Sequence, residues 1–214
     1  ARSGDWRYFD RAEEAARHTA SVDTVTSAPS ESVLGLQKAH SLGHVGGYEW
    51  ERPEDAQYWF TAGIWNTGHM WSQGTLTTWC LTGDRRYRDA GMMLAEWFAR
   101  EEARGIHEQI HRSQGWSTIA SLGGYHVVPH PWYLNAARLF SQNAVSRQSP
   151  GTGAFIHGIG ECEHDVRHMG GKTFMTGVVM TGMKMLDQID PDEDLKNSLL
   201  RSADWMYWRM WHPN

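Results

Sequence analysis

The sequence has few cysteines, no long apolar run and no run of basic residues. Its 214 residues include only two cysteines, and Cys80 falls within a helical pattern, so a disulfide framework is not indicated. No apolar stretch approaches the roughly 20 residues that a membrane-spanning helix needs. Lys and Arg number 20 against 25 Asp and Glu, which gives a formal charge of −5. We therefore expect neither nucleic acid nor a membrane as a partner.

The motifs of several enzyme classes are also missing. The chain contains no Walker A sequence, no G-x-S-x-G and no dinucleotide-binding glycine pattern. Nucleotide hydrolysis, serine hydrolysis and dinucleotide-dependent chemistry therefore have no support. The N-terminal residues, ARSGD, are not a signal peptide and do not begin with Met, which suggests a processed chain or a piece of a larger one. The compartment stays undecided, and a secreted or periplasmic protein is compatible with the sequence.

Tryptophan and histidine are abundant, with twelve of each. Hydrophobic residues make up 40% of the chain and charged residues 21%, so the chain can bury a core and lacks the composition of a disordered protein. We expect one folded domain, or a segment of one, over residues 1–214. The tryptophans either fill helix interfaces or line a groove, where flat aromatic faces stack on sugar rings. Composition does not decide between these interpretations.

A short motif, G-D-x-R-Y-x-D, occurs at Gly4 and again at Gly83, and an alanine follows it within two positions in each copy. Asp5 and Asp84 stand at the position of a helix N-cap in the two copies. Apolar residues then recur at steps of three and four, which is the spacing of an amphipathic helix. In the second copy they are Tyr87, Ala90, Leu94 and Phe98. Each copy therefore predicts the start of an outer helix.

A weaker third copy begins at Asp190. Asp190 is the predicted N-cap, Pro191 suits the first helical position, and Glu193 completes a capping-box-like pair. This copy predicts a further amphipathic helix that extends to Ala203 and Trp205.

Nearly uncharged segments precede the second and third copies. Residues 67–81 and 172–186 are rich in Gly, Met and Thr and are predicted to be inner helices, buried on most sides. A third inner helix is expected over residues 132–140. Long connections over residues 21–63, 104–128 and 144–170 would leave the array at one shared rim. The sequence thus predicts an all-α fold of repeated inner/outer helical hairpins.

Residues 68–74, GHMWSQG, followed by residues 81–87, LTGDRRY, resemble the helix starts of the α/α-toroid carbohydrate-active enzymes. This superfamily contains polysaccharide lyases and related glycosidases. The resemblance implies a partial or complete (α/α)n toroid and an enzyme, with no required cofactor, that acts on a polysaccharide or oligosaccharide. Those proteins normally contain more hairpins than this chain supplies, so the remainder of a larger chain is a further expected partner.

The toroid lyases cleave uronate-containing glycans by β-elimination, and the resemblance implies residues for each step. Asn66 is expected to neutralise the substrate carboxylate, His69 or His126 to act as the base, and Tyr125 to act as the acid. Asn66 and His69 are three positions apart at the start of a predicted inner helix and share a face. The alternative is that His69 caps a helix or bonds within the core.

Further residues are predicted to bind the substrate. Aromatic and basic side chains in or beside the predicted rim are the candidates: Trp65, Trp71, Trp132, Arg167 and Lys172.

A metal site is a separate prediction. His164 and His168 are four positions apart, a spacing that lets two imidazoles of one helix share an ion such as zinc, and Cys162 supplies a third ligand. Glycines on both sides favour a loop, in which this spacing loses its meaning. A solvated polar loop without metal is therefore the alternative.

Two other functions stay open. Carboxylates at Glu49, Glu51, Glu54 and Asp55 are compatible with a glycoside hydrolase on the same scaffold. A non-catalytic helical-repeat binding or scaffold module would instead have its aromatic residues packed, and His69 would bond to the backbone.

Overall fold

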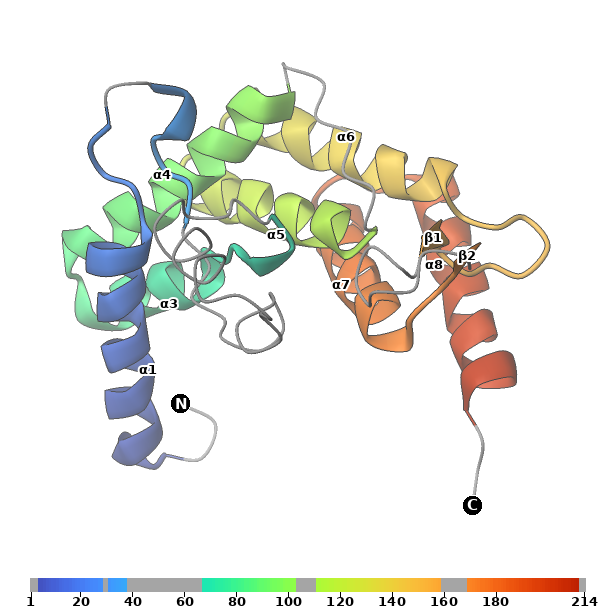
Figure 1. Ribbon diagram of the computed structural model, residues 1–214, viewed down its shortest axis with the longest axis horizontal. Coiled ribbons are helices and arrows are strands. Elements are labelled where there is room, and N and C mark those ends of the chain that lie inside the picture. Colours follow the sequence, from blue (N-terminus) through green and yellow to red (C-terminus); the bar gives the residue numbers. More distant parts are fainter. Residues whose placement is uncertain (1–3, 29–30, 38–66, 103–110, 159–168, 212–214) are drawn as a thin grey trace, which may run out of the picture. The chain divides into compact units, whose positions relative to one another are not determined.

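A computed structural model describes residues 4–28, 31–37, 67–102, 111–158 and 169–211 (Figure 1). These residues are mainly helical, which confirms the predicted all-α class. The chain divides into two compact units, Ala1–Trp97 and Phe98–Asn214, and each is described by itself. Within the described residues, none of the helices is both long and apolar enough to cross a membrane.

The first unit is built from α1, α3 and most of α4. Their bounds, with the short helical turns between them, are α1 (Trp6–His18), a π-turn (Thr19–Asp23), 3₁₀ turns (Glu31–Val33 and Thr67–His69), α3 (Gln73–Thr82) and α4 (Arg85–Glu102). Helices α3 and α4 form a hairpin, because only Gly83 and Asp84 separate them and Gly83 has a φ of 74°. The predicted pair of an inner helix and an outer helix is confirmed here.

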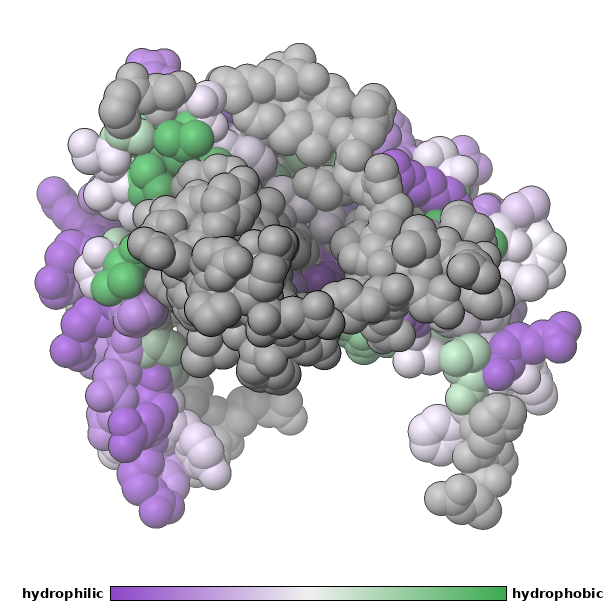
Figure 2. All heavy atoms as spheres, in the orientation of Figure 1, coloured by the Kyte–Doolittle hydropathy of each residue, from purple (hydrophilic) through white to green (hydrophobic). Residues whose placement is uncertain are grey.

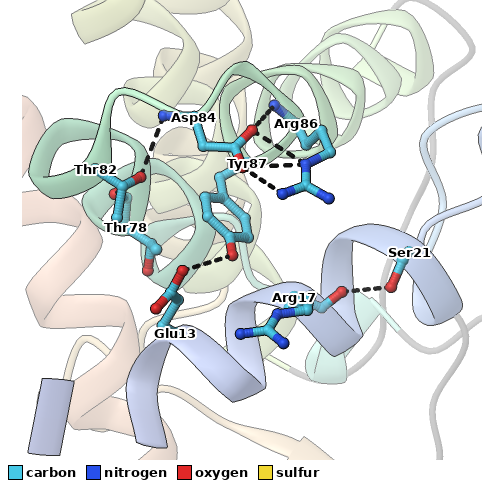
Figure 3. Close-up of polar contacts among 8 residues, drawn as sticks. All are labelled: Glu13, Arg17, Ser21, Thr78, Thr82, Asp84, Arg86 and Tyr87. Atoms are coloured by element: carbon cyan, nitrogen blue, oxygen red, sulfur yellow. Dashed lines mark hydrogen bonds and ion pairs between the residues drawn. The ribbon is translucent and has the colours of Figure 1, made fainter. Parts of the chain in front are cut away.

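The two G-D-x-R motifs fold in the same way. The Asp5 carboxylate accepts a hydrogen bond from the backbone N–H of Arg7 at 3.0 Å, and Asp84 accepts one from Arg86 at 2.9 Å (Figure 3). Each arginine side chain also bonds to its aspartate, which holds the pKa of both carboxyls below the usual value. The motif is thus a helix cap with an added ion pair, and both predicted N-caps are confirmed.

Helix α4 supplies much of the core of the first unit. Tyr87, Ala90 and Leu94 are buried, as their spacing predicts. The Tyr87 hydroxyl donates to a Glu13 carboxylate oxygen on α1 at 3.3 Å (Figure 3). Helix α1 buries only Ala16, and its outer surface, at the lower left of Figure 2, is mostly hydrophilic. Tyr87 therefore ties a weakly buried helix to the core.

The inner helix α3 is shorter than predicted. It begins at Gln73, and residues 70–72 are not helical. The backbone N–H of Trp71 donates to the Gln37 side chain at 2.8 Å, and the Trp71 carbonyl accepts from the same side chain at 3.1 Å. Because these bonds occupy both backbone groups of Trp71, the segment does not continue the helix.

The second unit consists of two further hairpins and a small sheet. The elements are α5 (His111–Val127), α6 (Pro131–Ser146), β1 (His157–Gly158), β2 (Met169–Gly170), α7 (Thr173–Ile189), α8 (Glu193–Trp205) and a π-turn (Met206–Met210). Strands β1 and β2 pair antiparallel.

The prediction of a connection over residues 104–128 is wrong, because α5 occupies most of it. This helix is buried on nearly every side and contacts both α6 and α7. Two of its hydroxyl groups bond within the helix: Ser117 donates to the Ser113 carbonyl and Thr118 to the Gln114 carbonyl, both at 2.8 Å. A helix without a polar face shows no amphipathic period, so the sequence pattern did not reveal it.

Helix α6 is longer than the inner helix predicted over 132–140, and it is the outer partner of α5. It buries one side and leaves Asn135 and Gln142 exposed on the other. It also extends to Ser146, into the predicted connection over 144–170. The inner helices of the second unit are therefore α5 and α7.

Helices α5 and α7 run parallel and touch through glycines. A Cβ atom on Gly115 would lie 2.8 Å from the Val178 carbonyl carbon, and one on Gly182 would lie 3.1 Å from the Thr118 Cβ. The contacts advance in the same direction on both helices, so the N-terminal ends of α5 and α7 lie at the same end of the unit. The predicted shared rim depended on a connection over residues 104–128, most of which is α5; the rim of the second unit is therefore defined here as the end at which α5 and α7 begin.

The third helix start differs from the prediction. Asp192, not Asp190, caps α8, and it accepts from the Leu195 backbone N–H at 2.8 Å. Asp190 instead ends α7 and pairs with the Arg138 guanidinium of α6. Pro191 consequently precedes the cap, since the ion pair holds Asp190 outside the new helix.

Candidate functional site

The segment that leads into α3 presents two of the predicted site residues side by side. His69 ends the 3₁₀ turn, and Trp71 follows with 47% of its surface exposed. Their ring centroids lie 6.0 Å apart. This arrangement places an imidazole beside an exposed indole.

Gln37 fixes this arrangement and was not predicted from the sequence. It is buried, and its side-chain amide makes the two hydrogen bonds with the Trp71 backbone described above. The residues are 34 positions apart, so no local pattern links them. Gln37 therefore holds the backbone of the candidate site in place, although nothing in the local sequence distinguishes it from other polar residues.

Basic side chains gather at the N-terminal ends of the parallel helices of the second unit. The Arg112 guanidinium carbon lies 5.9 Å from the centre of the Phe174 ring, and Arg112 is only 5% exposed. Lys172 immediately precedes α7, and no side chain caps that helix by a hydrogen bond. Two cationic side chains beside the starts of two helices make this rim favourable for an anion.

A buried pair of histidines lies beside this rim. The rings of His111 and His157 are inclined at 65° to each other, with centroids 4.6 Å apart. His111 also stacks on Phe155 at 6.0 Å. Burial, together with the nearby His157, Arg112 and Arg147, lowers the pKa of His111 to about 3. His111 is therefore uncharged at neutral pH.

A hydrogen-bond network around Gln148 lies shortly before β1 in the chain. The Gln148 side-chain nitrogen donates to the Gly153 and Ser198 carbonyls, both at 2.9 Å. Its oxygen accepts from the Arg201 guanidinium at 2.6 Å. These bonds fix the turn over residues 149–154 against α8, and the turn leads directly into β1.

Tyr125 and His126 do not open an inner segment as predicted, because they lie in the last turn of α5. Thirteen positions along a helix separate Tyr125 from Arg112, a distance of about 20 Å. Trp132 lies in the first turn of α6, which follows α5 after a short turn. Tyr125, His126 and Trp132 are thus at the opposite end of the second unit from Arg112 and Lys172.

Several predicted residues lie outside the described residues. They are Asn66, Trp65 and Arg167, the proposed metal ligands Cys162, His164 and His168, and the carboxylates Glu49, Glu51, Glu54 and Asp55. In the part of the chain that the structure describes, no three His, Cys, Asp or Glu side chains gather in a way that could hold a metal.

No protein-family model and no curated protein sequence matches this chain. Among solved structures, the chain is similar to an inactive variant of the α-1,6-mannanase GH76A of Salegentibacter sp. HEL1_6 in complex with α-1,6-mannotetrose. The two share 16% sequence identity with a TM-score of 0.49, over 95% of this chain and 70% of that chain.

Proposed function

We propose that this protein is a carbohydrate-active enzyme that cleaves glycosidic bonds in a polysaccharide or oligosaccharide. The observation that supports this function best is the exposed Trp71 indole beside the His69 ring. The indole offers a flat apolar face on which a sugar ring can stack. Histidine is the side chain best suited to proton transfer near neutral pH. Gln37 holds the backbone of Trp71 through two hydrogen bonds.

The rim of the second unit favours a glycan that carries carboxylates. Arg112 and Lys172 stand at the ends of two helices whose N–H groups also attract anions. In β-elimination the base removes the C5 proton of a uronate, the bond from C4 to the leaving oxygen breaks, and a C4–C5 double bond forms while the oxygen is protonated. The assignment of Asn66 as neutraliser, His69 or His126 as base and Tyr125 as acid stays a prediction from the family resemblance.

Hydrolysis is the second candidate reaction. The sequence offers Glu49, Glu51, Glu54 and Asp55 as the carboxylates for it. Two carboxylates are what a glycosidase needs, one to protonate the leaving oxygen and one to activate water or attack the sugar.

One experiment separates the reactions. The protein is incubated with uronate-containing and neutral polysaccharides while new reducing ends and the absorbance near 235 nm are followed. Elimination raises both signals, because it creates a conjugated double bond, whereas hydrolysis raises reducing ends alone. The proposal is overturned if neither signal rises with any substrate while the protein remains folded.

Variants connect the activity to the proposed site. His69→Ala is expected to lower kcat by about 100-fold or more, the usual contribution of a general acid or base. Trp71→Ala is expected to raise KM about tenfold through the loss of stacking. Trp6→Ala is the matched control, because Trp6 is an exposed tryptophan of α1. Equal effects of Trp6→Ala and Trp71→Ala would exclude Trp71 as a sugar platform.

A further inference from the structure

The His111–His157 pair takes no part in the proposed function. His111 begins α5 and His157 begins β1, and their side chains are 0% and 2% exposed. The short distance between the rings brings two imidazoles together in the interior of one compact unit.

The ring nitrogens of His111 lack a hydrogen-bond partner. Among the described residues neither its Nδ1 nor its Nε2 bonds to any group, although both atoms are buried. A buried polar atom without a partner costs about 1–3 kcal/mol. No part of the ring is open to water, so solvent does not remove this cost. A ligand smaller than a water molecule and able to accept a nitrogen lone pair would do so.

We propose that His111 and His157 together bind a divalent transition-metal ion such as zinc. Imidazole nitrogen is a preferred ligand of zinc, nickel and copper. Bonds of about 2.0 Å in tetrahedral geometry place two ligating nitrogens little more than 3 Å apart. Two rings whose centroids are 4.6 Å apart can present nitrogens at that separation after small rotations.

The surroundings determine how tightly the ion would bind. Arg112 and Arg147 carry positive charge near His111, and Phe155 covers one face of its ring. In the described part of the chain the pair is not joined by a third His, Cys, Asp or Glu side chain to form a group that could hold a metal. The affinity is therefore expected to be lower than that of a closed four-ligand zinc site.

The two histidines belong to elements that are far apart in the sequence, so an ion bound by both would link those elements. A shared metal would join the start of α5 to β1, the strand that leads into the segment over residues 159–168. That segment carries Cys162, His164 and His168, the ligands that the sequence spacing predicts. The pair proposed here is a different ligand set, and the two can be distinguished by substitution.

The test is metal binding by the whole chain, with no substrate present. The protein is stripped with EDTA, titrated with Zn²⁺ by calorimetry, and analysed for zinc after dialysis; Co²⁺ gives a visible absorption band as a second readout. One equivalent of zinc is expected. His111→Gln and His157→Gln should each weaken binding at least tenfold. His126→Gln, an exposed histidine of the same helix, should leave binding unchanged.

Circular dichroism and the melting temperature show whether each variant is folded. Added zinc should raise the melting temperature of the wild type but not that of His111→Gln or His157→Gln. Absence of bound zinc in the wild type overturns the proposal. So does zinc binding that survives both pair substitutions but is lost in His164→Gln or His168→Gln, which would favour the sequence-based ligand set. Because no glycan is involved, failure of the proposed enzyme activity does not affect this result.

Discussion

The side-chain amide of Gln37 supplies the Trp71 backbone with the two hydrogen bonds that a neighbouring strand would supply. Gln37→Leu leaves the Trp71 N–H and carbonyl without these bonds, so we expect a loss of about 2 kcal/mol in the free energy of unfolding. Urea unfolding measures it. The control is Gln73→Leu at an exposed position, for which a change within about 0.5 kcal/mol is expected. Equal effects at the two positions would show that Gln37 does not hold this backbone in place.

Asp192 and Asp190 offer a second comparison of single residues. Asp192→Ala removes the cap of α8 and should lower the free energy of unfolding by about 1 kcal/mol, whereas Asp192→Asn should keep most of it. Asp190→Ala removes only an ion pair that is partly exposed, so a smaller loss is expected. A larger loss at Asp190 than at Asp192, measured by chemical unfolding, would support the cap expected from the sequence motif.

The ion pair of Asp84 with Arg86 predicts a pH dependence. Because the pKa of Asp84 is lowered in the folded protein, its contribution to stability is present above the pKa of the unfolded chain and is lost as pH falls through the folded value. Arg86→Gln should raise the pKa of Asp84 toward its ordinary value in an NMR titration. Asp5, which keeps Arg7, serves as the internal control and should titrate as in the wild type.

Between elements, the contact of α5 with α7 leads to a sharp prediction about glycine. Alanine normally stabilises a helix by up to about 1 kcal/mol relative to glycine. Gly115→Ala should nevertheless lower the free energy of unfolding by about 2 kcal/mol, because its Cβ would meet the backbone of Val178 and Val179. Gly177→Ala is the matched control on α7, since nothing lies within 4 Å of its Cβ, and it should stabilise the protein. Thermal and urea unfolding test both signs.

Whether a helix can be predicted from the sequence depends on whether one of its faces is exposed to solvent. Helix α4 has a charged face, so its apolar period is visible and its buried residues Tyr87, Ala90 and Leu94 were found. Helix α5 is buried on nearly every side, and the hydroxyls of its buried Ser117 and Thr118 bond to carbonyls of the same helix. The sequence therefore offers no contrast between two faces from which to recognise it.

At the scale of the whole molecule, burial predicts which helices open most easily. Twelve of the seventeen residues of α5 are buried, whereas α1 buries only Ala16. Amide hydrogen exchange should therefore be slowest in the middle of α5 and fastest in α1 among the described helices. Comparable protection in α1 and α5 would contradict the assignment of α5 as the core helix of its unit.

The candidate sites were also only partly visible in the sequence. His69 and Trp71 were predicted because they are close together in a motif, and the structure places their rings side by side. Gln37, His111 and His157 were not predicted as partners, since each acts through a contact with a distant segment. The spacing of residues in the sequence indicates which side chains are neighbours within one helix or strand. Contacts between distant segments form only when the helices and strands pack together.

The glycine contact between α5 and α7 also has a consequence for the order of folding. Each hairpin of the second unit joins neighbouring segments and closes a short loop, but the α5–α7 contact joins segments separated by the whole of α6 and β1. Closing a longer loop costs more chain entropy, so the hairpins should form before they dock. A substitution at Gly115 should then leave the refolding rate nearly unchanged and speed unfolding, which stopped-flow fluorescence would measure.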